Sequence, residues 1–296
     1  MTATARPRTT VVTVAHDSGA VLGAMLASLP AGTPVIIVDN ASTDRASLAR
    51  LAADHGATLL RNDRNAGFGV ACNQGAALAQ GEFVLFVNPD TTLDPGCIAA
   101  LEQGLDRHAG ASAANPVILN ANGSNANKHG SVLLPRTRRL PADLPTKDHP
   151  VPILTGSVLM VRLQAFRALG GFDPNIFLYH EDDDLALRLK ASCGPLYIFP
   201  TATARHLQGQ SSPRAPGTAR FKAFHMGRSR VYAARKHGRP FALTAALCRA
   251  VLNLLSPDML WSPRRRAKNA GFLAGVLSMA RSAPPALTDP PFIVKP

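Results

Sequence analysis

The sequence contains few aromatic residues and no closely paired cysteines. Aromatic residues make up 5% of the 296 residues, with a single tryptophan, so a nucleic-acid-binding surface of interleaved basic and aromatic side chains is not expected. The four cysteines are scattered and form no Cys-x-x-Cys pair (Cys72, Cys97, Cys193 and Cys248). This spacing favours reduced thiols in a cytosolic protein over a disulfide framework or a zinc site.

Long hydrophobic runs are also absent. The most apolar stretch, residues 241–255, is interrupted by Arg249 and is shorter than the about 20 residues that a membrane-spanning helix needs. The apolar run within residues 1–16 is too short for a signal peptide, so we expect a cytoplasmic protein. Because 46% of the residues are hydrophobic, we expect one large globular domain, or one domain with an appendage.

Acidic residues are scarce relative to basic ones. The chain has 19 Asp and Glu against 32 Lys and Arg, which gives a formal net charge of +13 at pH 7. Such an excess favours an anionic partner, which could be a nucleic acid, an anionic membrane surface or a phosphorylated substrate. In so basic a chain, a concentration of acidic residues needs an explanation of its own.

Buried strands and helices alternate in the first 90 residues. Strands are expected at 10–15, 35–38, 57–60 and 83–87, and helices at 21–29, 44–55 and 70–79. This alternation predicts an α/β fold with a mostly parallel sheet and helices on both faces. Polar residues directly follow three of the strands, at His16–Asp17, Asp39–Asn40 and Asn88–Asp90. Open α/β sheets bind their ligands at this edge.

The pattern changes after residue 90. Helices are expected at 96–108 and 162–169, strands at 115–119, 151–161 and 196–199, and a mobile polar loop at 207–220. The stretch 120–150 is rich in Asn, Pro and Arg and shows little periodicity. Since compact domains rarely carry so long a loop without a role, this stretch is expected to be either functional or disordered.

Four consecutive acidic residues, Glu181–Asp184, are the most unusual feature of the chain. They follow an apolar segment and precede a helical pattern with Leu185 and Leu189 on one face, which places them in the first turn of a helix. The helix dipole stabilises an acidic residue there by about 0.3–1 kcal/mol, which explains one or two but not four. A general base requires a carboxylate that is firmly held at the mouth of a pocket.

Six segments of the chain, taken in order, carry a resemblance to a known family. They are VVTVAHDSG, VIIVDNASTD, NDRNAGFGVACNQG, FVLFVNPDTTLDP, TGSVLMVRLQAFRALGGFDPNIFLYHEDDDLALRLKASCG and IFPTATARHLQGQSS, and they cover about residues 9–212. The chain resembles the family 2 glycosyltransferases, and within them the bacterial rhamnosyltransferase-like branch. The resemblance implies a GT-A fold and inverting transfer of a sugar from a nucleotide sugar to a hydroxyl group, with one divalent cation.

The resemblance also implies a nucleotide-sugar pocket and a metal site. Asp39 resembles the residue that holds the nucleotide base, and the other expected pocket residues are Thr13, Ala15, His16, Asp17, Arg64, Gly67, Asn73, Asn88, Asp90 and Gly156. Asn88-Pro89-Asp90 stands where the family keeps its Asp-x-Asp element, so Asp90 is the expected ligand of Mg²⁺ or Mn²⁺. His206 matches a histidine that adds a ligand from the far side.

Catalytic roles follow from the resemblance in the same way. In the pair Glu181-Asp182, Asp182 matches the catalytic base, while Asp184 and Tyr179 are expected on the acceptor side. The chemistry is consistent with these roles, because an acceptor hydroxyl is a poor nucleophile and needs a carboxylate to take its proton. A hard cation with oxygen ligands would neutralise the charge that develops on the nucleoside diphosphate.

We expect a catalytic domain over residues 1–240 and a basic helical extension over residues 241–296. The catalytic domain would comprise a Rossmann-like nucleotide-sugar half at about 9–95 and an acceptor half at about 96–240. In the extension, a basic cluster at 264–268 accompanies apolar positions at helical spacing. This pattern suits a helix lying on the anionic inner face of the plasma membrane, or a helix packed on the catalytic domain with a solvated basic edge.

The branch resemblance implies dTDP-rhamnose as donor and a glycan or polyprenyl-linked acceptor in cell-surface polysaccharide synthesis. Two alternatives stay open. A nucleic-acid-binding protein would fit the net charge, but the chain shows no nucleic-acid-binding motif, so a nucleic acid partner is not expected. A sugar nucleotidyltransferase would need a Gly-rich loop with a basic residue after the first strand, where this chain has His16-Asp17-Ser18.

Overall fold

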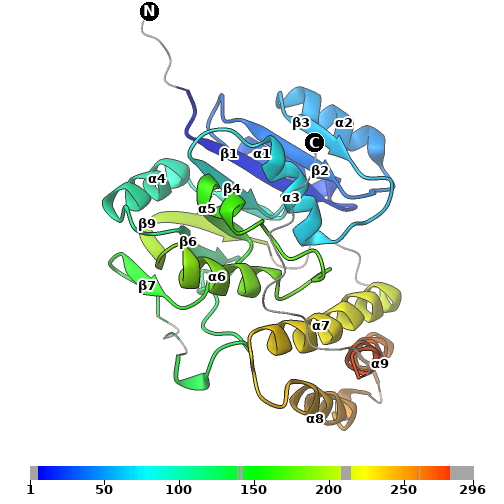
Figure 1. Ribbon diagram of the computed structural model, residues 1–296. Coiled ribbons are helices and arrows are strands. Elements are labelled where there is room, and N and C mark those ends of the chain that lie inside the picture. The colour runs from blue at the N-terminus through cyan, green and yellow to red at the C-terminus, as the bar shows by residue number, and fades with distance from the viewer. Residues whose placement is uncertain (1–5, 139, 141–142, 208–214, 260, 281–296) are drawn as a thin grey trace, which may run out of the picture.

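A computed structural model describes residues 6–138, 140, 143–207, 215–259 and 261–280. Its centre is a nine-stranded sheet with the order β3-β2-β1-β4-β8-β6-β9-β5, and β7 pairs with β9 outside this path (Figure 1). The strands are β1 (Thr9–Ala15), β2 (Val35–Asp39), β3 (Thr58–Arg61), β4 (Phe83–Val87), β5 (Thr91–Leu93), β6 (Ala113–Asn120), β7 (His149–Val151), β8 (Val158–Arg162) and β9 (Leu196–His206). The helices are α1 (Gly19–Ala27), α2 (Arg45–Asp54), α3 (Phe68–Leu78), α4 (Cys97–Arg107), α5 (Leu163–Ala168), α6 (Glu181–Ser192), α7 (Pro216–Lys236), α8 (Ala242–Leu254) and α9 (Pro263–Ser278), with 3-10 turns η1 (Arg136–Arg138) and η2 (Pro257–Met259).

The first four strands pair as the sequence predicts. β3, β2, β1 and β4 run parallel, with Ala15 opposite Asp39. Every residue of β1, β2 and β4 is buried, as expected for parallel strands with both faces covered. The carboxyl ends of these strands meet at one edge of the sheet, which brings together the polar residues that follow them.

The second half of the sheet is mixed. β8 pairs antiparallel with β4 and β6, β6 pairs parallel with β9, and both β5 and β7 pair antiparallel with β9. The single strand predicted at 151–161 is wrong, because β7 ends at Val151 and β8 begins at Val158. β9 continues past the predicted end at residue 199 to His206, because β6 and β5 supply pairing partners along that length.

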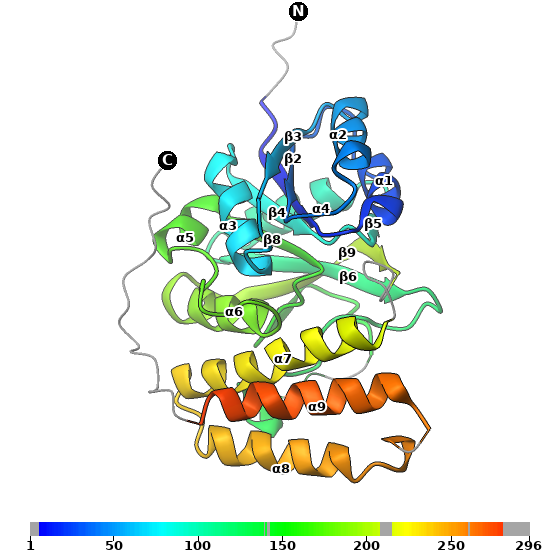
Figure 2. The same ribbon diagram turned by 90° about the vertical axis from the view of Figure 1, so that its right-hand side faces the viewer.

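Helices cover both faces of the sheet, as predicted (Figure 2). One hydrophobic cluster joins α1, α2 and α4 to one face through side chains such as Leu22 and Leu101. A second cluster joins α3, α5 and α6 to the opposite face through Ala76, Phe166 and Leu189. The second cluster fixes α6, and with it the acidic run, against the sheet.

The C-terminal helices form a separate layer below the sheet (Figures 1 and 2). α7, α8 and α9 share a third hydrophobic cluster that includes Val231, Ala246 and Phe272. Since α7 belongs to this layer, the helical unit begins at Pro216, before the expected boundary at 240 and inside the predicted polar loop at 207–220. Residues 208–214 of that loop and 281–296 of the extension lie outside the described residues.

α9 packs closely on α7. A Cβ atom at Gly271 or Gly275 would collide with the backbone of Arg220 or Phe224, so small residues let the two helices approach. The apolar side of α9 is therefore buried within the protein, which is the second of the two arrangements that the sequence left open. Within the described ranges, no helix is both long and apolar enough to span a bilayer.

Candidate active site

Buried oxygen atoms without a partner lie at the carboxyl ends of β1 and β2. Asp39 has no exposed surface, and its Oδ1 accepts a hydrogen bond from the Ser42 backbone N–H at 2.8 Å, whereas its Oδ2 has no hydrogen-bond partner. The hydroxyl oxygen of Thr13 on the neighbouring strand is likewise buried without a partner. Because buried polar atoms are nearly always hydrogen-bonded, these two oxygens are suited to accept from a ligand.

Asn40 organises the loop after β3. Its side-chain oxygen accepts from the Ala66 backbone N–H at 2.9 Å and from Asn62 Nδ2 at 3.0 Å, and its Nδ2 donates to Asn65 Oδ1 at 2.9 Å. These bonds tie the loop to the end of β2 and leave Arg64 exposed within it. The loop thus presents a positive charge near the strand ends.

Gly67 brings this loop against the segment that precedes the acidic run. Its φ is 90°, and a Cβ there would lie 2.7 Å from the Phe177 carbonyl oxygen, which also accepts from the Phe68 N–H at 2.9 Å. Only glycine permits this approach. The helix that follows, α3, therefore starts beside the segment leading to α6.

Asn73 holds α3 to the turn before the acidic run. Its Oδ1 accepts from the Phe172 backbone N–H at 2.8 Å, and its Nδ2 donates to the Phe172 carbonyl oxygen at 2.8 Å. Both ends of the amide are thus engaged by one backbone unit. The expected contact of Asn73 with the nucleotide stays a prediction.

His16 and Asp17 are exposed just beyond β1. His16 Nδ1 lies 3.0 Å from the Asn40 carbonyl oxygen. Asp17 Oδ1 accepts from both the backbone N–H and the hydroxyl of Thr43, each at 2.8 Å. The backbone bond from Thr43 is the main cause that lowers the pKa of Asp17, so its carboxylate is ionised at the rim of the sheet edge.

Asp90 and His206 meet from different parts of the chain. Asp90 Oδ1 lies 3.2 Å from His206 Nε2, because β5 and β9 pair in the register that sets Thr91 opposite His206. A carboxylate and an imidazole are both ligands that divalent cations accept, so this pair fits Mg²⁺ or Mn²⁺. In the described part of the chain, no group of three or more His, Cys, Asp or Glu side chains could hold a metal. A donor diphosphate and water would have to complete the coordination.

The Asp90 loop lies beside the turn at residues 155–157. The Asn88 backbone N–H donates to the Ser157 carbonyl oxygen at 2.9 Å, and the Gly156 N–H donates to Asp182 Oδ2 at 2.8 Å. A Cβ at position 156 would lie 3.0 Å from that same Asp182 oxygen, so glycine lets the carboxylate approach the turn. These two hydrogen bonds therefore link the segment that carries Asp90 to Asp182 in the acidic run.

The chain turns sharply into α6. Tyr179 and His180 both adopt left-handed backbone conformations, with φ of 67° and 69°. The helix begins at Glu181, and all four acidic residues lie in its first turn, as predicted. Such consecutive strained residues persist only where the surrounding structure holds them, and here they aim the acidic residues at the turn and at the helical layer.

Lys128 is a residue of this site that the sequence analysis missed. Its Nζ lies 2.6 Å from Asp182 Oδ1 and 2.8 Å from Asp183 Oδ1. Burial by itself would lower the pKa of Lys128, but the two carboxylates outweigh it and hold that pKa above its ordinary value. The only signal in the sequence was the length of the 120–150 loop, which predicted a role but no residue.

The other carboxylates of the run have structural partners. Burial would raise the pKa of Asp183, but Lys128 and His180 lower it below its ordinary value, with His180 Nδ1 at 2.8 Å. Asp184 has no exposed surface and lies against three nitrogen groups, with Arg188 Nε at 2.8 Å, His237 Nε2 at 2.8 Å and Lys236 Nζ at 2.9 Å.

The carboxylate of Asp184 is therefore engaged by protein partners, and its expected place on the acceptor side stays a prediction. Burial would raise the pKa of Asp184, but the hydrogen bond with His237 and the charges of Arg188 and Lys236 outweigh it and hold that pKa below its ordinary value. Two of them, Lys236 and His237, lie at the end of α7. Asp184 thus ties the helix of the acidic run to the C-terminal layer.

The pKa of Glu181 is raised, in contrast to the lowered pKa values of Asp183 and Asp184. Burial, and next the charge of Asp182, raise the pKa of Glu181 to about 8. Its Oε2 is buried without a hydrogen-bond partner. Tyr179 lies beside it, and burial raises the pKa of that phenol as well. At neutral pH, Glu181 is therefore largely protonated, whereas Asp183 and Asp184 are ionised.

A family assignment follows from the comparison with known proteins. Residues 10–170, more than half of the chain, match the family described as Glycosyl transferase family 2. The chain belongs to glycosyltransferase family 2. The sequence segments that suggested this family span the strand ends and the acidic run described above.

Relatives of this family 2 glycosyltransferase support the expected branch. The N-acetylglucosaminyl-diphospho-decaprenol L-rhamnosyltransferase of Mycobacterium tuberculosis is 33% identical over 269 residues, covering 77% of this chain and 84% of the relative. An uncharacterized glycosyltransferase of the same species is 38% identical over 88 residues, or 30% of this chain. The resemblance to rhamnosyltransferases is therefore confirmed.

Solved structures confirm the GT-A fold. A mannosyltransferase from Pyrobaculum calidifontis in complex with GDP-Man and Mn²⁺ has a TM-score of 0.55 at 16% identity, covering 93% of this chain and 87% of that one. Residues 1–349 of TarS from S. aureus give 0.54 at 14% identity, covering 93% and 91%. At such identities the likeness concerns the fold alone.

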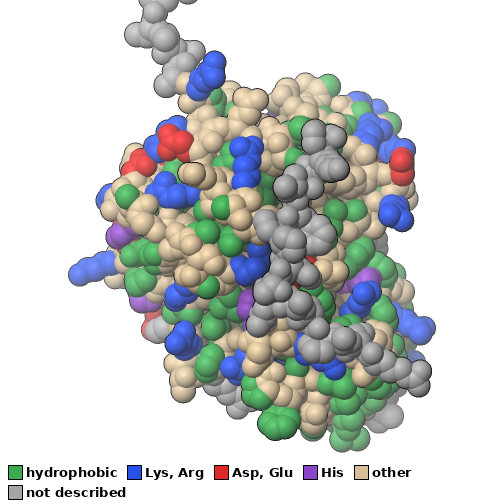
Figure 3. Space-filling model, viewed as in Figure 1, with side chains coloured by type: hydrophobic (Ala, Val, Ile, Leu, Met, Phe, Trp, Pro, Cys, Tyr) green, Lys and Arg blue, Asp and Glu red, His purple; other side chains and the backbone are tan. Residues whose placement is uncertain are grey.

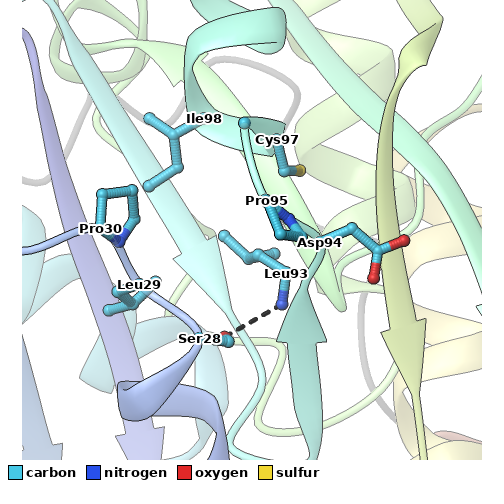
Figure 4. Close-up of a pocket in the computed structure, with 9 residues that line it drawn as sticks. Ser28, Leu29, Pro30, Leu93, Asp94, Pro95, Cys97 and Ile98 are labelled. Atoms are coloured by element: carbon cyan, nitrogen blue, oxygen red, sulfur yellow. Dashed lines mark hydrogen bonds between the residues drawn. The ribbon is translucent and has the colours of Figure 1, made fainter.

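A cavity of about 300 Å³ lies between the end of α1, β5 and the start of α4 (Figure 4). The Leu93 backbone N–H donates to Ser28 Oγ at 3.0 Å at its edge. None of the candidate nucleotide, metal or acidic residues lines this cavity. This cavity is therefore separate from the candidate residues at the carboxyl edge of the sheet.

Proposed function

We propose that the protein is an inverting rhamnosyltransferase that moves rhamnose from dTDP-rhamnose to a hydroxyl of a polyprenyl-linked N-acetylglucosamine acceptor. The sugar and the acceptor are those that the name of the mycobacterial relative suggests, and dTDP as the nucleotide rests on the resemblance to the rhamnosyltransferase-like branch. The observation that carries the proposal is the placement of Asp182, which is held by the Gly156 turn next to the Asp90–His206 pair.

Asp182 is the base in this proposal. The side chains of Asp182, Asp183 and Asp184 are 12%, 4% and 0% exposed, so Asp182 offers the most accessible carboxylate of the three. Gly156 fixes one of its oxygens and Lys128 the other, which holds it in one orientation. A carboxylate oxygen has two lone pairs. Oδ1 of Asp182 already accepts from both Lys128 and the Asp183 backbone N–H, so Oδ2, which accepts from Gly156, is the oxygen that can take a further hydrogen bond from an acceptor hydroxyl.

The reaction is a single displacement. The acceptor oxygen bonds to the anomeric carbon, the bond from that carbon to the diphosphate oxygen breaks, and the acceptor proton moves to Asp182. Because attack comes from the face opposite the leaving group, the configuration inverts and no protein nucleophile is needed. Asp90 and His206 would hold Mg²⁺ or Mn²⁺, which supplies charge stabilisation to the departing diphosphate when bound.

The nucleotide would lie over the ends of β1 and β2. Asp39 Oδ2 and the Thr13 hydroxyl are buried acceptors that suit the N–H groups of a base. Ala15, His16 and Asp17 would line the same pocket. Arg64 and the Gly67 turn would close over the diphosphate from the adjacent loop, where the positive charge favours a phosphate.

The proposed acceptor carries its sugar on a membrane lipid, so the protein would work at the cytoplasmic face of the plasma membrane as a peripheral protein. The basic excess of the chain supports this location, since that face is anionic.

Turnover measured with dTDP-, UDP- and GDP-sugars, with Mg²⁺ or Mn²⁺, tests the proposal. We expect transfer from dTDP-rhamnose to a short-chain polyprenyl-diphosphate N-acetylglucosamine. Asp182→Asn should lower turnover by about two to four orders of magnitude with donor affinity intact. Asp183→Asn is the matched control and should retain more activity. An Asp182→Asn protein with normal turnover would show that the base lies elsewhere.

A binding measurement tests the metal site separately. Asp90→Ala should abolish transfer and weaken metal-dependent donor binding in calorimetry. Donor affinity that is unchanged by EDTA, in both the wild type and Asp90→Ala, would refute the role of Asp90.

A further inference from the structure

α8 is apolar on the face that it turns away from the protein. Toward the protein, Ala246 and Ala250 are buried. Most residues exposed on the outward side are also apolar, whereas Thr244 and Arg249 are polar. We call the apolar outward set the α8 face, and it comprises Phe241, Ala245, Cys248, Leu252 and Leu255. A helix with apolar residues on its outward side as well as its buried side is normally covered on both.

The exposure of the α8 face is large. Phe241 is 81% exposed, Leu252 63% and Leu255 73%, and the nearby Trp261 is 78% exposed. Hydrophobic side chains gather over α8 at the lower end of the molecule (Figure 3). Arg249 is the only charged residue in α8. Contiguous exposed apolar surface of this kind marks an interaction site.

A basic cluster borders the α8 face. Arg264, Arg265, Arg266 and Lys268 are exposed in the first turns of α9. The start of α9 lies against the end of α8, because Asn269 Nδ2 donates to the Asn253 carbonyl oxygen at 2.7 Å. The cluster therefore adjoins Leu255 and Trp261. Together, the apolar face and the basic cluster form an amphipathic surface.

We propose that the α8 face docks on an anionic lipid bilayer. Phe241, Leu252, Leu255 and Trp261 would enter the boundary between headgroups and acyl chains, where tryptophan is favoured. The basic cluster would contact the lipid phosphates. The sequence pattern pointed to α9 for this role, but the apolar side of α9 is buried on α7, and the apolar surface that remains free to insert belongs to α8.

A second copy of the chain fits this surface less well than a lipid does. A two-fold contact centred on Leu252 and Leu255 would bring the two basic clusters next to each other. Each chain already carries a formal net charge of +13. Repulsion between the two basic clusters would oppose association of two copies, whereas anionic headgroups neutralise each cluster.

Docking also orients the catalytic edge. α7 lies between α8 and the sheet, and its Ser229 Oγ donates to the Leu178 carbonyl oxygen at 2.9 Å, just before the acidic run. When the α8 face is docked, only the layer of C-terminal helices therefore separates the acceptor side from the bilayer. On the proposed function, this suits an acceptor whose sugar stays attached to a membrane lipid. The docking itself requires neither donor nor acceptor.

Co-sedimentation of the full-length protein with vesicles tests the inference. Vesicles of phosphatidylglycerol and phosphatidylcholine should bind the protein at low salt, and phosphatidylcholine alone should bind it weakly. The double variant Leu252→Gln/Leu255→Gln should lower the partition coefficient at least about tenfold. Arg264→Gln and Arg265→Gln should each lower it about fivefold.

Matched controls lie at the far end of the molecule. Leu78→Gln on α3 and Arg50→Gln on α2 also replace exposed residues and should leave the partition coefficient unchanged. Thermal unfolding checks that each variant is folded. Wild-type protein that ignores anionic vesicles at low salt overturns the inference, and so does equal loss of binding in variants and controls. A dimer in light scattering that Leu252→Gln/Leu255→Gln dissociates would make the α8 face an interface between copies.

Transfer to a water-soluble acceptor analogue separates this inference from the proposed function. The α8 variants should keep wild-type turnover with that analogue, since they lie outside the catalytic edge. If no protein transfers sugar while vesicle binding follows the expected pattern, the proposed function fails and the docking surface stands.

Discussion

Glu181 should make the protein less stable as pH rises, and replacing it should remove that dependence. Burial and Asp182 raise its pKa from the ordinary 4.5 to about 8. A carboxyl group with a raised folded pKa binds its proton more tightly in the folded state. The contribution of Glu181 to the free energy of unfolding therefore falls as pH rises above about 4.5, and it is lowest above about pH 8.

The size of this effect follows from the two pKa values. Since one pKa unit corresponds to about 1.4 kcal/mol, the gap between 4.5 and 8 amounts to at most roughly 5 kcal/mol. Relaxation of the buried carboxylate reduces such penalties, so we expect about 2–5 kcal/mol at high pH. Glu181→Gln keeps the size and removes the charge, and it should be more stable than the wild type by this amount at about pH 8.5, with little difference at about pH 4.5.

Urea unfolding at several pH values measures the difference. Glu82→Gln is a matched control of the opposite sign, because Arg8 lowers the pKa of the exposed Glu82 and its charge stabilises the folded state. That variant should not gain stability with rising pH. If Glu181→Gln differs from the wild type by the same free energy at every pH, Glu181 is not held neutral in the folded protein.

Substitutions at three further positions probe the contacts around the acidic run. Lys128→Met should destabilise the protein by about 2–4 kcal/mol in urea, because two carboxylates lose their shared cation, while Lys128→Arg retains most of the stability; equal stability of both would contradict the ion pairs. Gly156→Ala should lower kcat about tenfold at unchanged Tm, because its Cβ displaces Asp182 by a few tenths of an ångström; normal kcat would show that this turn does not position the base. Asp184→Asn should cost about 3 kcal/mol at neutral pH. That cost should shrink as the pH falls through the lowered pKa of Asp184, and a cost that persists in acid would exclude the charge as its cause.

The local sequence pattern is sufficient to predict most helices and strands and the position of the acidic run at the start of a helix. The apolar run at 35–38 forms a buried strand because a parallel sheet that is covered on both faces needs apolar side chains on both of them. Leu185 and Leu189 are both fully buried at helical spacing, so the start of α6 and the carboxylates at its first turn could be predicted. The roles of Asp90 and Asp182 that the family motifs imply stay predictions.

Partners from distant segments decided what each carboxylate of the run does. Asp182, Asp183 and Asp184 are adjacent and chemically alike, yet Lys128 and the Gly156 turn hold the first, while Lys236 at the end of α7 pairs with the third. No local pattern encodes such pairings, because they depend on where loops and helices meet.

The same limit applies to surfaces. The sequence predicted an apolar stretch where α8 lies, and for α9 it left open whether the helix lies on the membrane or packs on the catalytic domain. Close packing of Gly271 and Gly275 on α7 buries the apolar side of α9 and leaves the α8 face exposed. Which side of an apolar helix is covered depends on the helices beside it, so local periodicity determines that a helix forms, and the tertiary packing decides which face it offers to a partner.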